Sequence, residues 1–173
     1  MNRPRKLTMA AMSLAMVAMM GTAMLTVMPP TRGAVGQQKS EEVDVQRVEA
    51  TAKDFIAAIS NRDIQSMERL WAHEPYATFM GPLSTTIVAG WDGVRKAWEM
   101  RFGQFDRVTI SLADSHVHIN GKVAWAVGIE RVQLLRKNGD TLGFDAFVTN
   151  VFEQHDGRWL VVSHQATPIF RGK

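Results

Sequence analysis

The sequence predicts an α+β protein in which three helices come first and an antiparallel sheet follows. Residues 41–102 carry apolar side chains at helical spacing, whereas residues 108–167 are rich in β-branched and aromatic side chains. The turn signals Asn120-Gly121, Asn138-Gly139 and Asp156-Gly157 separate the β-rich runs. This segregation of helices and strands predicts three helices packed on one face of a strongly curved sheet.

Three helices are predicted from the spacing of apolar residues. The first spans Glu41 to Ser60, with Ser40 as its cap, and the third spans Gly90 to Phe102. A second, short helix lies between them. The residues at helical spacing are Val45, Val48, Ala52, Phe55, Ile56 and Ile59 in the first helix, Ile64, Met67, Leu70 and Trp71 in the second, and Val94, Trp98 and Phe102 in the third.

The predicted strands are short runs between turn residues. A brief strand candidate at residues 76–80 comes before the third helix. The other runs are 108–112, 115–119, 123–135, 142–152 and 159–167.

The first 36 residues have the composition of a targeting segment. Three basic residues precede Leu7 to Met28, a run of 22 residues without charge, and Ala34-Val35-Gly36 provides the small residues of a cleavage site. The run is also long enough to span a bilayer as a helix. We therefore expect a signal peptide or a retained anchor at residues 1–36, a linker at 37–40 and one domain at 41–173. The domain is then exported, either periplasmic or secreted, and it is attached to a membrane only if the segment is retained.

Charge and cysteine content exclude several classes of function. From Gln37 onward the chain has 16 basic and 17 acidic side chains, and no Lys/Arg-rich block remains. Nucleic-acid binding therefore lacks its electrostatic basis. The chain has no cysteine, which excludes disulfides and thiol catalysis.

Several short runs resemble one superfamily. They are Leu70-Trp71-Ala72, Gly90-Trp91-Asp92-Gly93-Val94-Arg95, and the final run from Asp156 to Gln165. Over residues 45–170 the chain resembles the nuclear transport factor 2-like superfamily, in its SnoaL-like and ketosteroid-isomerase-like branch. The resemblance implies a cone-shaped, cystatin-like fold with a pocket at its open end and a homodimer formed through the outer sheet face. It implies no particular activity, because this fold hosts isomerases, dehydratases, cyclases and binding domains.

Glu130, Asp145 and His164 are the candidate catalytic residues. If Asn138-Gly139 is a two-residue loop, Glu130 lies opposite Phe147, and both carboxylates share one sheet face. Such a pair suits general acid–base catalysis. The alternative is that the carboxylates only pair with neighbouring cations, which are Arg131, Arg136 and Lys137.

The position of His164 depends on the last hairpin. A two-residue loop at Asp156-Gly157 places His164 opposite Thr149 and beside the two carboxylates. A three-residue loop at 155–157 instead turns His164 to the face of Asn150. Kinase association domains of the superfamily, which the run 149–152 resembles, carry a basic pocket residue at the position of Asn150. His164 also has a purely structural interpretation as a hydrogen-bonded histidine.

Four further residues are predicted to shape a ligand pocket. They are Tyr76, Trp98, Asn150 and His73, of which Trp98 is the candidate pocket wall and His73 lies at the rim beside Glu74. His116 and His118 share a strand face, but no third ligand accompanies them, so we predict no metal site and no cofactor.

Three functions are compatible with these patterns. The first is binding of a small apolar or carbonyl-containing ligand. The second is a cofactor-free isomerase, dehydratase or cyclase that uses a carboxylate or histidine as general base. The third is a dimeric assembly module with a vestigial pocket. A neutral histidine or a carboxyl group of raised pKa inside an apolar pocket would favour the enzyme.

Overall fold

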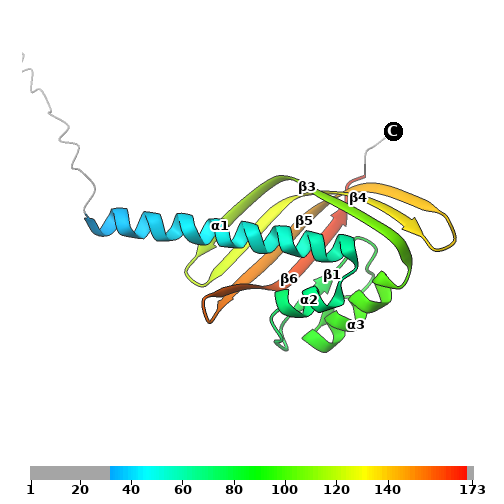
Figure 1. The fold of residues 1–173 in the computed structure, drawn as a ribbon, viewed down its shortest axis with the longest axis horizontal. Helices are drawn as coiled ribbons and strands as arrows, with labels where there is room; N and C mark the ends of the chain where they lie inside the picture. The colour runs from blue at the N-terminus through cyan, green and yellow to red at the C-terminus, as the bar shows by residue number, and fades with distance from the viewer. Residues whose placement is uncertain (1–31, 171–173) are drawn as a thin grey trace, which may run out of the picture. The chain divides into compact units, whose positions relative to one another are not determined.

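The computed structural model describes the backbone of residues 32–170 and the side chains of residues 40–170. Three helices and six strands make up the described part (Figure 1). The helices are α1 (Arg32–Asn61), α2 (Ile64–Leu70) and α3 (Trp91–Phe102). The strands are β1 (Thr78–Met80), β2 (Val88–Ala89), β3 (Phe105–Asn120), β4 (Val123–Arg136), β5 (Thr141–His155) and β6 (Arg158–Pro168).

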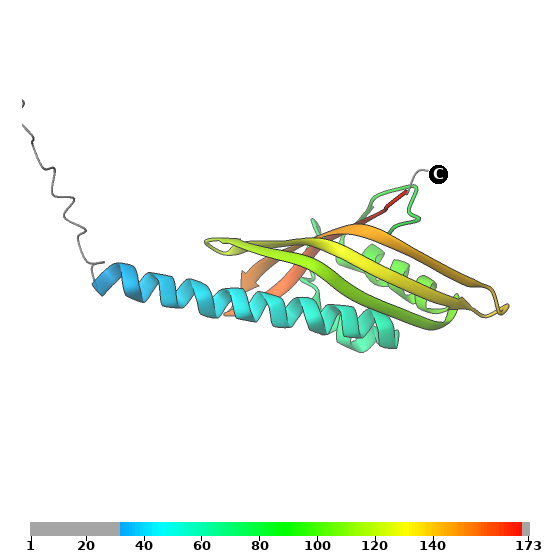
Figure 2. The same ribbon diagram turned by 90° about the horizontal axis from the view of Figure 1, so that it is seen from above.

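The strands form one curved sheet in the order β2-β1-β6-β5-β4-β3 (Figure 2). Strands β3 to β6 are joined as an antiparallel meander, which confirms the predicted α+β class. The short β1 adds a parallel pairing to β6, and β2 pairs with β1 at the edge. Neither the parallel pairing nor β2 was predicted, because two or three residues carry no readable alternation.

The helices pack on one face of this sheet. Helix α1 contacts β3, β6 and α2, and α3 contacts α2 and β1. The buried face of α1 is formed by residues at the predicted helical spacing. Its fully buried members include Val48 and Phe55, which belong to the core together with Trp71, Phe79, Phe152 and Val161.

Helix α1 begins earlier than predicted. It starts at Arg32 rather than at Glu41, so residues 37–40, the predicted linker, are helical. Residues 1–31, which carry most of the predicted signal or anchor, lie outside the described residues. None of the helices within residues 32–170 is long and apolar enough to cross a membrane.

Helix α2 is short and has a well-formed N-terminal cap. The Asp63 carboxylate accepts hydrogen bonds from the backbone N–H groups of Gln65 and Ser66, at 3.0 Å each. Such a cap satisfies N–H groups that have no partner within the helix. Because α2 ends at Leu70, the following Trp71 adopts an extended backbone and is buried beneath the helices.

A bulge in β3 joins two runs that were predicted as separate strands. The pairing with β4 shifts between Ala113 and His116, and Asp114 in this interval has a φ of 51°. Gly128 lies opposite, where an added Cβ would come within 3.1 Å of the Ala113 carbonyl oxygen. A bulge bends and twists its strand, and the glycine leaves room for it.

Candidate functional site

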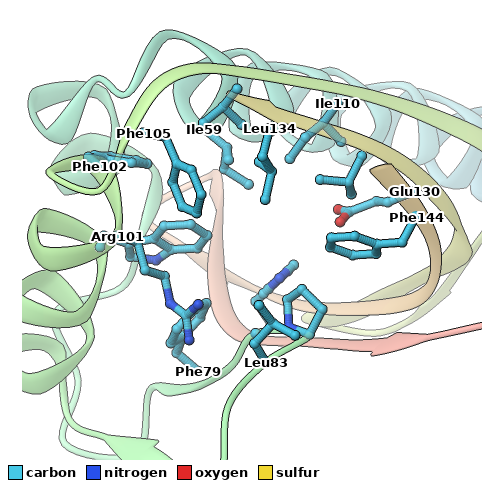
Figure 3. Close-up of a pocket in the computed structure, with 16 residues that line it drawn as sticks. Ile59, Phe79, Leu83, Arg101, Phe102, Phe105, Ile110, Glu130, Leu134 and Phe144 are labelled. Atoms are coloured by element: carbon cyan, nitrogen blue, oxygen red, sulfur yellow. The ribbon is translucent and has the colours of Figure 1, made fainter. Parts of the chain in front are cut away.

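A cavity of about 80 Å³ lies between the helices and the concave sheet face. It is lined by residues of α1, α3, the loop after β1, and strands β1 and β3 to β6 (Figure 3). Most of these residues are apolar, and only Arg101, Glu130 and His164 carry ionisable side chains. The cavity is therefore an apolar space with three chemically distinct groups in its wall.

Glu130 is the buried acid of this cavity. Its side chain is 3% exposed, and its Oε1 atom has no hydrogen-bond partner among the described residues. Burial disfavours the charged carboxylate and raises the pKa of Glu130 to about 7. Glu130 can therefore gain or lose a proton near neutral pH.

Asp145 does not join Glu130, so the predicted pair of carboxylates is wrong. Arg136 donates its N–H to the Asp140 carbonyl, so the turn that this hydrogen bond closes has three residues, 137–139, rather than two. This extra loop residue shifts the register by one. Glu130 lies opposite Ala146, and Asp145 lies opposite Arg131 on the other sheet face.

His164 faces the cavity, and its partner is Asn150. The two lie opposite each other, and His164 Nδ1 is 2.7 Å from Asn150 Oδ1. The turn is the two-residue alternative, since His155 pairs with Arg158 across Asp156-Gly157, yet His164 lies on the face of Asn150 that the three-residue alternative predicted. A bulge between the pairs Val151–Ser163 and Phe152–Val161 changes the face instead, because Val162 is an extra residue in β6.

Aromatic rings surround His164. The rings of Phe79, Phe55 and Trp98 have centroids 5.7, 5.4 and 5.9 Å from the imidazole. Burial, with a smaller contribution from the Arg101 charge, lowers the pKa of His164 to about 3. The ring is therefore neutral at physiological pH. With its proton on Nδ1, donated to Asn150, the ring keeps a lone pair on Nε2.

Arg101 is the cavity residue that the sequence did not single out. It lies three residues after Trp98 on α3, and residues at this spacing share a helix face. Its guanidinium donates to Ser84 Oγ at 2.8 Å and lies 4.8 Å from the centroid of the Phe79 ring. Partial burial lowers the pKa of Arg101, but the guanidinium of an arginine keeps its charge in proteins.

The predicted pocket residues divide into two groups. Trp98 lines the cavity as expected, and Asn150 lies behind it as the partner of His164. Tyr76 and His73 do not line it. The Tyr76 hydroxyl is exposed and donates to Glu153 Oε2 at 2.7 Å, which raises its pKa to about 12. His73 stacks on Trp91 with a centroid distance of 4.6 Å.

The described side chains include no group of three metal-ligating residues. His116 and His118 lie on the exposed face of β3, and His118 stacks on the ring of Trp125. No ligand set for a metal is therefore found in the described part of the chain.

Comparison with known proteins identifies the family. A family model described as SnoaL-like domain matches residues 48–170. The chain belongs to the SnoaL-like family. The matched range includes every ionisable residue of the cavity, so the cavity lies within the family domain.

The fold of this SnoaL-like domain recurs in solved structures. A nuclear transport factor 2-like (NTF2-like) superfamily protein from Salmonella enterica is 18% identical with a TM-score of 0.70, covering 76% of this chain and 95% of that chain. An NTF2-like family protein from Streptomyces avermitilis is 20% identical with a TM-score of 0.69, covering 75% and 99%. At these identities the likeness shows the fold alone.

One curated protein also matches the SnoaL-like domain. It is the F-box protein SKIP8 of Arabidopsis thaliana, which is 25% identical over 114 residues. The match covers 66% of this chain and 46% of the plant protein, so the chain spans about half the length of that relative.

Proposed function

We propose that this SnoaL-like domain binds a small, largely apolar molecule in the cavity, and that Glu130 hydrogen-bonds a polar group of that molecule. The observation that carries the proposal is the buried Oε1 atom of Glu130, which has no partner among the described residues. A buried polar atom without a partner costs about 1–3 kcal/mol. A ligand that supplies the missing hydrogen bond recovers this free energy.

The size and chemistry of the cavity support a small organic ligand. One water needs about 10–15 Å³ of such space, and the cavity has about 80 Å³. Apolar side chains form most of its wall, as in typical small-molecule sites, where a few polar groups fix the orientation. The uncharged run from Leu7 to Met28 supports the further proposal that binding takes place outside the cytoplasm.

A second candidate function is cofactor-free proton transfer. It is favoured by Glu130, since a general acid or base works best when its pKa is near the working pH. Glu130 would take a proton next to a carbonyl group of the ligand, and a donor in the cavity would stabilise the enolate. The similar Streptomyces avermitilis structure is named as a candidate dehydratase, which is compatible with this class of chemistry.

Native mass spectrometry of protein purified from its own exported compartment tests the binding proposal. We expect a small molecule that stays bound under gentle conditions and leaves on denaturation. Glu130→Leu should carry it at lower occupancy, because the variant cannot hydrogen-bond the ligand. Glu49→Leu changes an exposed acid of α1 and serves as the matched control. Empty protein in every sample would contradict dedicated binding, and the denatured mass also locates the start of the mature chain.

An experiment with the ligand found by mass spectrometry distinguishes binding from catalysis. Incubated with the protein in D2O, a ligand that undergoes proton transfer should gain deuterium next to its carbonyl group. Glu130→Gln should abolish this exchange, because an amide cannot take the proton. A ligand that binds but gains no deuterium would support the binding proposal and contradict the enzymatic one.

We also propose that the outer sheet face forms a homodimer. Its exposed apolar side chains include Trp125 and Val127 on β4 and Phe147 on β5, and Phe147 is 59% exposed. Trp125→Arg should weaken dimerisation by about tenfold or more, because aromatic residues dominate protein interfaces. Sedimentation equilibrium measures this change, and Met100→Arg on the exposed side of α3 is the control. A wild-type monomer would contradict the proposal.

A further inference from the structure

Arg101 places a positive charge in the cavity wall without a matching negative charge. No carboxylate within the described residues forms an ion pair with its guanidinium, although ion pairs occur elsewhere, as between Arg95 and Glu99. Glu130 is the only acidic residue of the cavity wall. Figure 3 shows Glu130 and Arg101 on opposite sides of the cavity, so the acid does not cover the guanidinium.

The guanidinium is held in position by neutral groups only. It donates to Ser84 Oγ at 2.8 Å, and the same oxygen accepts the Gly81 N–H at 2.9 Å. The Phe79 ring lies under its plane, with 4.8 Å between Arg101 Cζ and the ring centroid. A guanidinium has five N–H donors, and Ser84 is the one hydrogen-bond acceptor that the described residues offer it. The remaining donors have no acceptor among the described residues, so a ligand in the cavity can accept from them.

The cavity has the wrong charge balance for a wholly apolar ligand. A wholly apolar ligand would bury the partly exposed guanidinium of Arg101 further, and burying a charge without a partner is costly. The low pKa of His164 leaves that ring neutral beside Arg101. A planar carboxylate fits the donor fork of an arginine, with two parallel hydrogen bonds. Such an anion would neutralise the one permanent charge of the cavity wall.

The remaining wall favours a flat, apolar ligand body. The rings of Trp98, Phe105 and Phe144 line the cavity. In Figure 3 the Phe105 ring lies on the side of Arg101 and the Phe144 ring beside Glu130. Aromatic side chains stack well on flat rings.

We infer that the cavity selects small aromatic carboxylates, with the carboxylate on Arg101 and the ring body between the aromatic side chains. This inference rests on the proposed ligand-binding function and names the chemical class of its ligand. Glu130, on the opposite side, then meets the end of the ligand that is remote from the carboxylate. A hydroxyl or amino group at that end would give Oε1 its missing partner.

Calorimetric titration with benzoate and benzamide tests the inference. The two probes have nearly the same shape and differ in charge. At about pH 6, where Glu130 is mainly protonated, benzoate should bind the full chain about tenfold or more tightly than benzamide, as expected of hydrogen bonds between charged groups. Arg101→Met should remove this preference, because it weakens benzoate binding far more than benzamide binding. Arg131→Met, on the outer sheet face, is the matched control and should keep the preference.

The outcomes separate this inference from the proposed function. Equal binding of the two probes, or a benzoate preference that survives in Arg101→Met, would overturn the inference and leave small-molecule binding in place. Absence of binding by both probes would also overturn the inference, and the native mass spectrometry experiment alone would then test the proposed function. Since Arg101→Met loses the contact with Ser84, its folding is checked by thermal unfolding. Arg101→Lys, which keeps the charge but not the planar fork, should retain part of the preference.

Discussion

Glu130→Gln should stabilise the protein more at about pH 8 than at about pH 4. The difference between the two effects on the free energy of unfolding should be about 3 kcal/mol. Burial raises the pKa of Glu130 from 4.5 to about 7, so the folded protein holds a proton that the unfolded chain has lost between these values. Each unit of difference corresponds to about 1.4 kcal/mol, and stability falls as the pH rises from 4.5 to 7. The amide cannot ionise and escapes this loss.

His164 acts in the opposite direction. Burial lowers its pKa from 6.5 to about 3, so the unfolded chain binds a proton that the folded protein excludes. Stability therefore rises with pH from about 3 to 6.5, by about 4–5 kcal/mol in total. Between about pH 4.5 and 6.5 the two effects nearly cancel. The wild-type protein should show a plateau there, whereas Glu130→Gln should continue to gain stability up to about pH 6.5.

Urea unfolding at a series of pH values measures both profiles. Glu49→Gln makes the same chemical change on the exposed surface of α1 and controls for the substitution itself. A Glu130→Gln effect that is the same at every pH would show that Glu130 does not titrate differently in the folded and unfolded states. The buried, partnerless carboxyl group would then be excluded.

Phe55→Ala should destabilise the protein by about 3–5 kcal/mol, the usual cost of removing a buried aromatic ring. Phe55 is 0% exposed, and its ring contacts the rings of Trp71, Trp98 and His164 edge-on. It therefore joins α1 to α3 and β6 at the centre of the core. The loss also removes one wall of the space around His164.

Thermal and urea unfolding check this prediction. Phe55→Leu keeps more of the buried volume and should cost clearly less. Met100→Ala, at a side chain 64% exposed on α3, is the surface control and should change stability by about 0.5 kcal/mol or less. A small effect of Phe55→Ala would mean that the helices do not depend on this contact for their packing on the sheet.

The helices and the main strands could be predicted from the sequence because their apolar residues repeat at the period of the element. Trp98 and Val94 illustrate this, since both are buried on the predicted face of α3. The N-terminal extension of α1 could not be predicted, because residues 33–39 contain no apolar repeat. Strand β2 was missed since its two residues are too few to alternate.

The candidate site was only partly predictable, because the face on which a strand residue lies depends on loops and bulges. Glu130 was expected on the inner face of the sheet and lines the cavity, whereas the face of His164 was left open between two turn lengths. Asp145 was misplaced by the extra loop residue in 137–139. A hairpin signal such as Asn-Gly fits both two-residue and longer loops. Arg101 was missed because a charged residue on an amphipathic helix is usually read as solvent-facing. Its spacing from Trp98 was the available signal.

The extra residue at Val162 has a consequence for how β6 can change over evolution. After Val162, the number of residues between the turn and the bulge decides on which sheet face each β6 residue lies, whatever the type of its side chain. Substitutions in this stretch alter one position at a time. A deletion of one residue between the turn and the bulge, with the bulge kept, would instead move His164 to the place of Ser163 and put Gln165 opposite Asn150. We therefore expect functional homologues to vary here in residue type but not in length.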